Sequence, residues 1–214
     1  MIEIPISRRR KRERERRTNE IIDVAEKIFS LKGFNKTTMD DIATELELTK
    51  PALYRYFKSK EDLYFAVVVR GADILDNMMI EAVESKKTGI EKIHATGVTF
   101  CKFYKKYPDY CTMMTHARST FLECYEGKSF QELAKSDESH LKIMCNAIET
   151  GKKDLTIRKD IDTFMTAVYL VESTIAIMQL SEGIGEAMKA MGKSNQDFIV
   201  HSLELMRHSL ENKK

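Results

Sequence analysis

The sequence contains only three prolines and nine glycines in 214 residues, and long alternations of β-branched residues are few. This scarcity disfavours β-sheet and predicts helices along most of the chain. No run of about 18 uninterrupted apolar residues occurs, which argues against a membrane span. The first residues, MIEIPISRRRKRER, have no apolar stretch after their basic cluster and do not resemble a signal peptide. We therefore expect a cytoplasmic all-α protein with no membrane partner.

The motifs of disulfide scaffolds and of common enzymes are also missing. The four cysteines, Cys101, Cys111, Cys124 and Cys145, are unevenly spaced without a C-x-x-C, which predicts reduced and mostly buried thiols. There is no G-x-S-x-G, no E-x-x-H pair and no glycine-rich phosphate loop. No histidine pair has metal-ligand spacing with a third partner nearby. We expect no enzyme activity, no cofactor and no metal site.

The positive charge is concentrated near the N-terminus. Residues 8–17, RRRKRERERR, hold eight cations and two acids, whereas the rest of the chain is slightly acidic. Such a segment, which we call the basic arm (residues 1–17), suits a polyanion, but Arg/Glu pairs would also suit a solvated start of a helix. Charge alone does not decide between these interpretations.

Four helices are predicted in the first part of the chain. Apolar residues recur at helical spacing over 14–32, and Gly33 suits the left-handed position that ends a helix. Thr38 with Asp41 predicts a capping box that starts a short second helix. Thr49 precedes a third helix, and Pro51 falls in its first turn. A backbone N–H there would have no partner within the helix, so the N–H that proline lacks is no loss. A second capping box, Ser59 with Asp62, opens a fourth helix over about 60–84.

The third predicted helix has two different faces. At 100° per residue, Leu53, Tyr56 and Phe57 lie on one side and can pack on the first two helices. Pro51, Tyr54, Arg55 and Lys58 lie on the other side, where burial would leave the two charges without evident partners. Hydroxyl, guanidinium and ammonium groups bind phosphates and base edges. Two short helices of this kind predict a helix-turn-helix whose second helix enters the major groove of double-stranded DNA.

The same segment resembles a known family. The runs A-x-x-x-F-x-x-x-G-F (from Ala25), T-T-x-x-x-I-A (from Thr37) and L-Y-x-Y-F-x-x-K-x-x-L (from Leu53) are similar to the N-terminal domain of TetR (tetracycline-repressor) family transcriptional regulators. The similarity covers about Arg14 to Val67. Glu47 departs from the pattern, because the family commonly has glycine in this turn, and a positive φ there would cost glutamate about 1 kcal/mol.

The resemblance implies roles for single residues. Phosphate contacts are implied for Thr38, Tyr54, Tyr56 and Lys60, and base contacts for Met39, Lys50, Pro51 and Ala52. The helical wheel puts Tyr56 at the buried edge of its helix, so its hydroxyl alone would reach the backbone of the DNA. From their exposed positions, Arg55 and Lys58 are added as DNA-contact candidates, for which an exposed charge at a helix end is the alternative.

The remainder of the chain resembles the family only in general character. We therefore divide the whole chain into a helix-turn-helix domain over 14–64 and a larger helical domain for ligand binding and dimerisation over 65–214. Helices are predicted over about 89–107, 109–126, 129–151, 160–182 and 195–211, with 181–195 as a connector that could hold a helical turn. The segment 163–180 is apolar nearly all round and must be covered on several sides. Together with the last helix, it resembles the four-helix dimer interface of the family, so a homodimer on a palindromic operator is expected.

Aromatic and methionine side chains of this domain suggest an apolar pocket for a small effector, although ordinary core packing would also explain them. The candidates are Phe100, Phe103, Tyr104, Met113, Met114, Phe121, Met144, Met165 and Tyr169. The resemblance implies a repressor that is released from DNA by an apolar or aromatic ligand. Two questions stay open. One is whether the ligand releases DNA or promotes its binding, and the other is whether any cysteine or histidine senses redox state or a metal.

Two other classes of protein stay open beside the repressor. The first is an all-α enzyme with an incidental helix-turn-helix. It would need a catalytic constellation, and the sequence contains none of the enzyme motifs named above. The second is a dimeric, ligand-responsive protein that acts by binding another protein. Specific binding of DNA separates both from the repressor.

Overall fold

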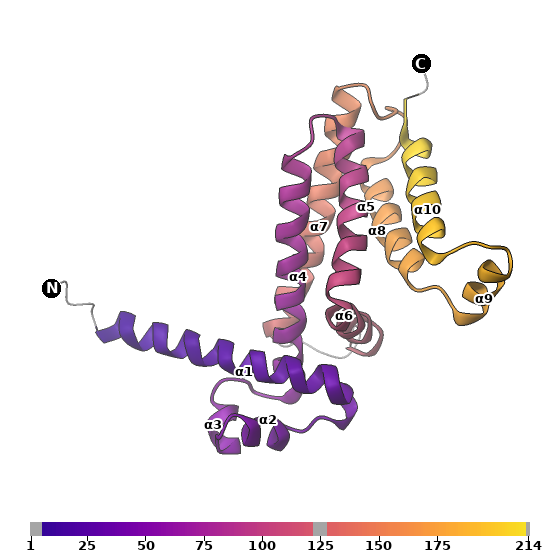
Figure 1. Cartoon of the computed structure of the whole chain (residues 1–214). Helices are drawn as coiled ribbons and strands as arrows, with labels where there is room; N and C mark the ends of the chain where they lie inside the picture. The colour runs from indigo at the N-terminus through magenta and orange to yellow at the C-terminus, as the bar shows by residue number, and fades with distance from the viewer. Residues whose placement is uncertain (1–5, 122–127, 213–214) are drawn as a thin grey trace. The chain divides into compact units, whose positions relative to one another are not determined.

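The computed structural model describes residues 6–121 and 128–212, and every regular element in these ranges is a helix. One isolated antiparallel bridge joins Ile157 to Glu211. The all-α prediction is confirmed. In chain order, as coloured in Figure 1, the helices are α1 (Ile6–Lys36), α2 (Met39–Glu45), α3 (Lys50–Tyr54), α4 (Lys60–Glu84), α5 (Gly89–Lys106), α6 (Pro108–Phe121), α7 (Lys128–Lys153), α8 (Thr163–Met178), α9 (Glu182–Ala190) and α10 (Asn195–Leu210).

The chain divides into two compact units that are not consecutive in sequence. The N-terminal unit combines Met1–Ala72 with Asp109–Ala134, and the C-terminal unit combines Asp73–Pro108 with Lys135–Lys214. The predicted boundary after residue 64 therefore differs from the division by contacts, which assigns α6 and the first turns of α7 to the N-terminal unit. Helices α4 and α7 contribute residues to both units.

The N-terminal unit is built on α1, which is longer than the predicted 14–32. Exposed pairs at helical spacing, Lys11–Glu15 and Arg16 with Glu13 and Glu20, support its first turns. At the other end, Gly33 has φ 74° and marks a break inside the helix, as its predicted left-handed role requires. The fully buried side chains that hold α1 to its neighbours include Ile21, Phe29, Ile42, Leu53, Leu63, Tyr64 and Phe65.

Helix α6 is fixed to α1 and α4 by contacts that the sequence pattern does not reveal. The Tyr110 hydroxyl donates to Glu26 Oε2 at 2.5 Å, and the Tyr64 hydroxyl donates to the Met113 carbonyl at 3.1 Å. Gly71 allows this close approach, because a Cβ at that position would lie 2.5 Å from Tyr110 Cδ1. Burial raises the pKa of Tyr64, so its phenol stays protonated and can donate.

The C-terminal unit has its own apolar core where α5, α7, α8 and α10 meet. Gly89 begins α5 against the backbone of Gly151 in α7, where an added Cβ would lie 2.0 Å from the Gly151 nitrogen. The core residues are Ile93, Met144, Ala147, Ile148, Ile157, Ala167, Leu170, Met206 and Leu210.

The helix boundaries of the C-terminal unit correct two predictions. Helix α8 is shorter than the predicted 160–182, because Asp162 caps it by accepting from the Met165 N–H at 2.7 Å. The predicted connector over 181–195 contains the nine-residue helix α9, none of whose residues is buried. The predicted end of the 109–126 helix falls partly on residues outside those described.

No single helix in the described ranges has the length and apolar character needed to cross a membrane. The bent pair of Thr163–Met178 and Glu182–Ala190 meets that test only when both helices are taken together.

Candidate nucleic-acid interface

The start of α2 is held by the capping box that its sequence predicts. Thr38 Oγ1 accepts from the Asp41 N–H at 3.1 Å, and Asp41 Oδ2 accepts from the Thr38 N–H at 2.8 Å. Lys32 Nζ lies 2.9 Å from Asp41 Oδ1. The bond from Lys32, followed by those from Thr38, lowers the pKa of Asp41 to about 2. The carboxylate is therefore charged at neutral pH and joins the first turn of α2 to Lys32 of α1.

The turn between α2 and α3 contains Glu47, the residue that departs from the glycine of the family pattern. Glu47 has φ 53°, in the left-handed region, so the positive φ considered for this position is confirmed. The Leu48 N–H donates to the Ala43 carbonyl at 2.8 Å, which closes the turn. Glutamate thus takes the conformation that glycine adopts most easily, at a cost of about 1 kcal/mol.

Helix α3 presents one buried and one exposed side. Leu53 is fully buried and Phe57, just beyond the helix, is 5% exposed. Tyr54 is 43% exposed. Together with the exposed side chains of Lys50, Pro51, Arg55 and Lys58, Tyr54 forms what we call the α3 surface. Ala52 and Tyr56 are half-buried at its edge. Two of the cations, Arg55 and Lys58, have no side-chain ion pair within the described part of the chain.

Two of the predicted DNA-contact residues have other roles in the structure. Met39 is 5% exposed and belongs to the core, so its thioether is not available to a base, and we do not include it in the candidate interface. Thr38 is exposed, but its hydroxyl is occupied by the capping box. Burial of Met39 follows from its place in the apolar stripe of α2 with Ile42 and Ala43.

Lys60 is engaged at the end of α1. Its ammonium donates to the carbonyls of Phe34 at 2.9 Å and Thr37 at 3.0 Å, and it lies 4.1 Å from the centre of the Phe34 ring. The Phe34 carbonyl also accepts from the Thr37 N–H at 3.3 Å, so Lys60 is an additional donor where α1 ends. Sequence reasoning missed this role, because the partners lie more than 20 positions away. A phosphate contact by Lys60 stays a prediction, and it would compete with these bonds.

Lys50 is paired with Asp40, a residue that sequence reasoning did not single out. Lys50 Nζ lies 2.7 Å from Asp40 Oδ2, and this contact joins the first residue of α3 to the first turn of α2. The hydrogen bond and charge of Asp40 raise the pKa of Lys50. No spacing rule connects positions ten residues apart across a turn, so only the fold reveals this pair.

The basic arm is helical from Ile6, and residues 1–5 lie outside those described. Its cations are exposed except the half-buried Arg17. Within the described residues no ion pair involves five of them, namely Arg8, Arg9, Arg10, Arg12 and Arg14. Exposed guanidinium groups without ion pairs suit phosphate binding.

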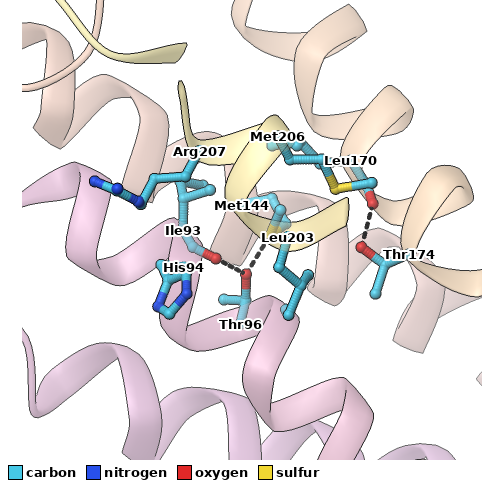
Figure 2. A pocket seen from close by; sticks show the side chains of 10 residues that line it. Ile93, His94, Thr96, Met144, Leu170, Thr174, Leu203, Met206 and Arg207 are labelled. Atoms are coloured by element: carbon cyan, nitrogen blue, oxygen red, sulfur yellow. Dashed lines mark hydrogen bonds between the residues drawn. The ribbon is translucent and has the colours of Figure 1, made fainter. Parts of the chain in front are cut away.

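The C-terminal unit contains a pocket whose lining differs from the prediction (Figure 2). Of the candidates, only Met144 lines it. Met165 and Tyr169 are 65% and 56% exposed, because α8 turns Ala167, Leu170 and Thr174 inward instead. The pocket is lined by Ile93, His94, Thr96, Gly97, Met144, Leu170, Thr174, Leu203, Met206 and Arg207.

The other predicted pocket residues lie elsewhere. Phe103 is fully buried, and Phe100 and Tyr104 are half-buried, but none of the three lines the pocket. Met113 and Met114 belong to the N-terminal unit, and the side chain of Phe121 lies outside the described residues. These candidates were chosen by residue type, which does not determine the face of a helix that borders a hollow.

The pocket combines an apolar interior with two basic side chains. Thr96 Oγ1 donates to the Ile93 carbonyl at 2.7 Å, and Thr174 Oγ1 to the Leu170 carbonyl at 2.7 Å, so both hydroxyls are already satisfied. His94 and Arg207 both lie near Glu204, with His94 Nε2 3.7 Å from Glu204 Oε1. Within residues 6–121 and 128–212, no group of three or more histidine, cysteine or acidic side chains could hold a metal ion.

Large apolar side chains are exposed on the last three helices. They are Phe164, Met165 and Tyr169 of α8, Ile184 of α9, Met191 just after it, and Val200 and Leu205 of α10. Exposed apolar surface of this extent is typical of a protein interface.

The N-terminal part of the chain is similar to bacterial transcriptional regulators. Residues 21–67 match the family described as "Bacterial regulatory proteins, tetR family". The transcriptional activator FasR of Mycolicibacterium smegmatis is 30% identical over 90 residues, or 42% of this chain and 41% of FasR. The biofilm operon negative regulator IcaR of Staphylococcus aureus (strain Newman) is 34% identical over 76 residues, or 36% of this chain and 41% of IcaR. The matches thus span about two fifths of these curated relatives.

Solved structures extend the similarity of fold to most of the chain. A TetR/AcrR-family transcriptional regulator from Thermobifida fusca has a TM-score of 0.70 at 25% identity, covering 89% of this chain and 96% of its own. FadR from Bacillus subtilis, solved in complex with stearoyl-CoA, has a TM-score of 0.67 at 16% identity, covering 89% and 98%. At such identity the second likeness concerns the fold alone.

Proposed function

Because residues 21–67 match the TetR family of bacterial regulatory proteins, we propose that this chain represses transcription by binding a palindromic DNA operator as a homodimer and is released by a small ligand. The observation that carries the proposal is the α3 surface. It joins cations and a tyrosine hydroxyl on one exposed side of a short helix whose other side is buried.

Each side chain of the α3 surface has a defined part in this proposal. Lys50 begins α3 and reads a base edge in the major groove, where guanine offers two acceptors. Tyr54, Arg55 and Lys58 follow along the exposed side and bind phosphates, which fix the register of the helix. The half-buried Tyr56 contributes its hydroxyl from the edge of this surface.

The basic arm adds affinity without sequence preference. Unpaired arginines that neutralise phosphates release counterions, and each phosphate contact adds about 0.9 to the slope of log affinity against log salt. Deletion of residues 1–13 is expected to reduce this slope while the preferred sequence stays the same. An unchanged slope would mean that the arm is only a solvated extension of α1.

The dimer is supported by the exposed apolar side chains of α8 and α10. Met165 and Tyr169 project from α8, and Val200 and Leu205 from α10, so a second copy would remove them from water. A two-fold dimer presents two α3 surfaces to half-sites about 34 Å apart, which gains affinity by avidity.

The proposed effector site is the pocket of the C-terminal unit. Its apolar lining from Ile93, Leu170 and Met206 favours an apolar or aromatic body, and methionine adapts to irregular shapes. Helix α4 belongs to both units, so a ligand that reshapes the C-terminal unit can act on the recognition helix through α4. The ligand shifts DNA binding only as far as its affinities for the two arrangements differ.

A mobility-shift assay with the DNA upstream of the chain's own gene tests the proposal, with a scrambled duplex as competitor. Wild-type protein should shift the upstream DNA, and Lys50→Ala should lose about 1–3 kcal/mol of discrimination if the lysine reads a guanine. Lys102→Ala, an exposed lysine of α5, is the matched control and should bind as wild type. Equal affinity for both duplexes would refute specific recognition. A reporter gene then separates repression from activation.

A further inference from the structure

Asp40 lies among the groups proposed to bind DNA, yet it carries the same charge as a phosphate. Its side chain is 64% exposed in the first turn of α2. It is not needed for the capping box or for the pairing of Lys32, because Asp41 performs both functions. The partner that the structure gives the Asp40 side chain is Lys50, at 2.7 Å. An acidic residue in the first turn also stabilises α2 through the helix dipole, but that effect does not require the bond to Lys50 in α3.

The pair changes what Lys50 can do before DNA arrives. Lys50 is 46% exposed, so the two groups meet in water, where such a pair contributes about 0–1 kcal/mol. A bond this weak can be exchanged for a better one. At a distance, the charges of Lys50 and Asp40 nevertheless nearly cancel. The pair therefore attracts a phosphate less than an unpaired lysine would. The pair thus reduces attraction that does not depend on sequence.

We propose that Asp40 is a specificity-determining residue, which occupies Lys50 in the unbound protein and opposes its use on phosphates. An ammonium group has three donors, so Lys50 can keep its bond to Asp40 while it donates to the acceptors of a base edge, such as O6 and N7 of guanine. Turning Lys50 to a phosphate instead separates the pair, so the cost of separation falls on phosphate contacts and not on the specific base contact. This inference rests on the proposed function, since it requires that α3 binds DNA.

The test compares Asp40→Asn with a control of equal charge change. Glu45→Gln alters an exposed carboxylate of the same helix, and no ion pair involves Glu45 among the described residues. Two probes are used, a duplex selected by wild-type protein from a random library and a scrambled duplex of the same composition. Affinities are measured by fluorescence anisotropy between about 50 and 200 mM salt, where phosphate contacts dominate the slope.

Asp40→Asn should strengthen binding to the scrambled duplex about two- to fivefold, the range that corresponds to loss of an exposed pair. Its salt slope on that duplex should steepen by about 0.9, for one added phosphate contact. Binding to the selected duplex should change less, so the ratio of the two affinities falls. Glu45→Gln should move both affinities equally. In a Lys50→Met background, the effect of Asp40→Asn on the ratio should disappear.

An unchanged or increased ratio in Asp40→Asn would overturn the inference, as would an effect that persists without Lys50. Asp40→Ser repeats the test with another uncharged side chain, and circular dichroism verifies that each variant is folded. If wild-type protein selects no duplex from the library, the proposed function fails first. If it selects one and Asp40→Asn behaves like Glu45→Gln, only the role of Asp40 fails.

Discussion

Lys60 offers the sharpest test of how the N-terminal unit is held together, because the family resemblance and the structure give it different roles. The substitution is Lys60→Met, which keeps most of the side-chain length and removes the ammonium. In the structure that ammonium donates to the carbonyls of Phe34 and Thr37 and lies over the Phe34 ring. The variant would remove this donor from both carbonyls, although the Phe34 carbonyl would keep the Thr37 N–H at 3.3 Å.

The expected loss follows from these contacts. A hydrogen bond from a charged group contributes about 1.5–3 kcal/mol when desolvated, and a cation–π contact at an exposed site about 0.5–1 kcal/mol. Lys60 is only half-buried, so water replaces part of both. We expect the free energy of unfolding to fall by about 2 kcal/mol, a decrease in Tm of about 4–8 °C for a chain of this size.

Urea denaturation followed by circular dichroism measures the change, and anisotropy with duplex DNA measures binding in parallel. Lys58→Met is the control, because Lys58 is exposed beside the same turn and its ammonium has no partner among the described residues. Lys58→Met should leave stability within about 0.5 kcal/mol of wild type, as for most surface substitutions. A Lys60→Met variant of wild-type stability with a salt slope reduced by about 0.9 would refute the structural role and favour a phosphate contact.

Three further predictions concern α2, its turn and the outer face of α8. Glu47→Gly should raise the free energy of unfolding, measured by urea denaturation, by about 0.5–1 kcal/mol, because a φ of 53° strains glutamate and not glycine. An unchanged free energy of unfolding would contradict that strain. Asp41→Asn should destabilise at pH 7, but the difference from wild type should shrink as pH falls below about 4 and be lost below about 2, because the folded pKa of about 2 is below the usual 3.8. A difference that does not shrink between about pH 4 and 2 would exclude this cause. Tyr169→Glu should give monomers in sedimentation experiments without loss of helicity, since Tyr169 is 56% exposed; a stable wild-type monomer would refute the dimer.

The sequence by itself determined the features whose physical causes are local. A capping box needs two residues three positions apart, so Thr38 and Asp41 predicted the start of α2, which the structure confirms. The two sides of α3 follow from helical period and from the cost of burying charge, and Leu53 and Tyr54 lie as that argument requires. The turn at Glu47 was marked by its departure from a family pattern and has the positive φ considered there.

The tertiary structure alone decided the contacts between distant segments. Lys60 meets the end of α1, Lys50 meets Asp40, and Tyr110 joins α6 to α1, because packing brings together groups that no periodicity relates. Helix α8 shows the same limit in another form. It is apolar nearly all round, so its sequence does not select an inner face, and only the neighbouring helices turn Leu170 inward and leave Tyr169 in solvent.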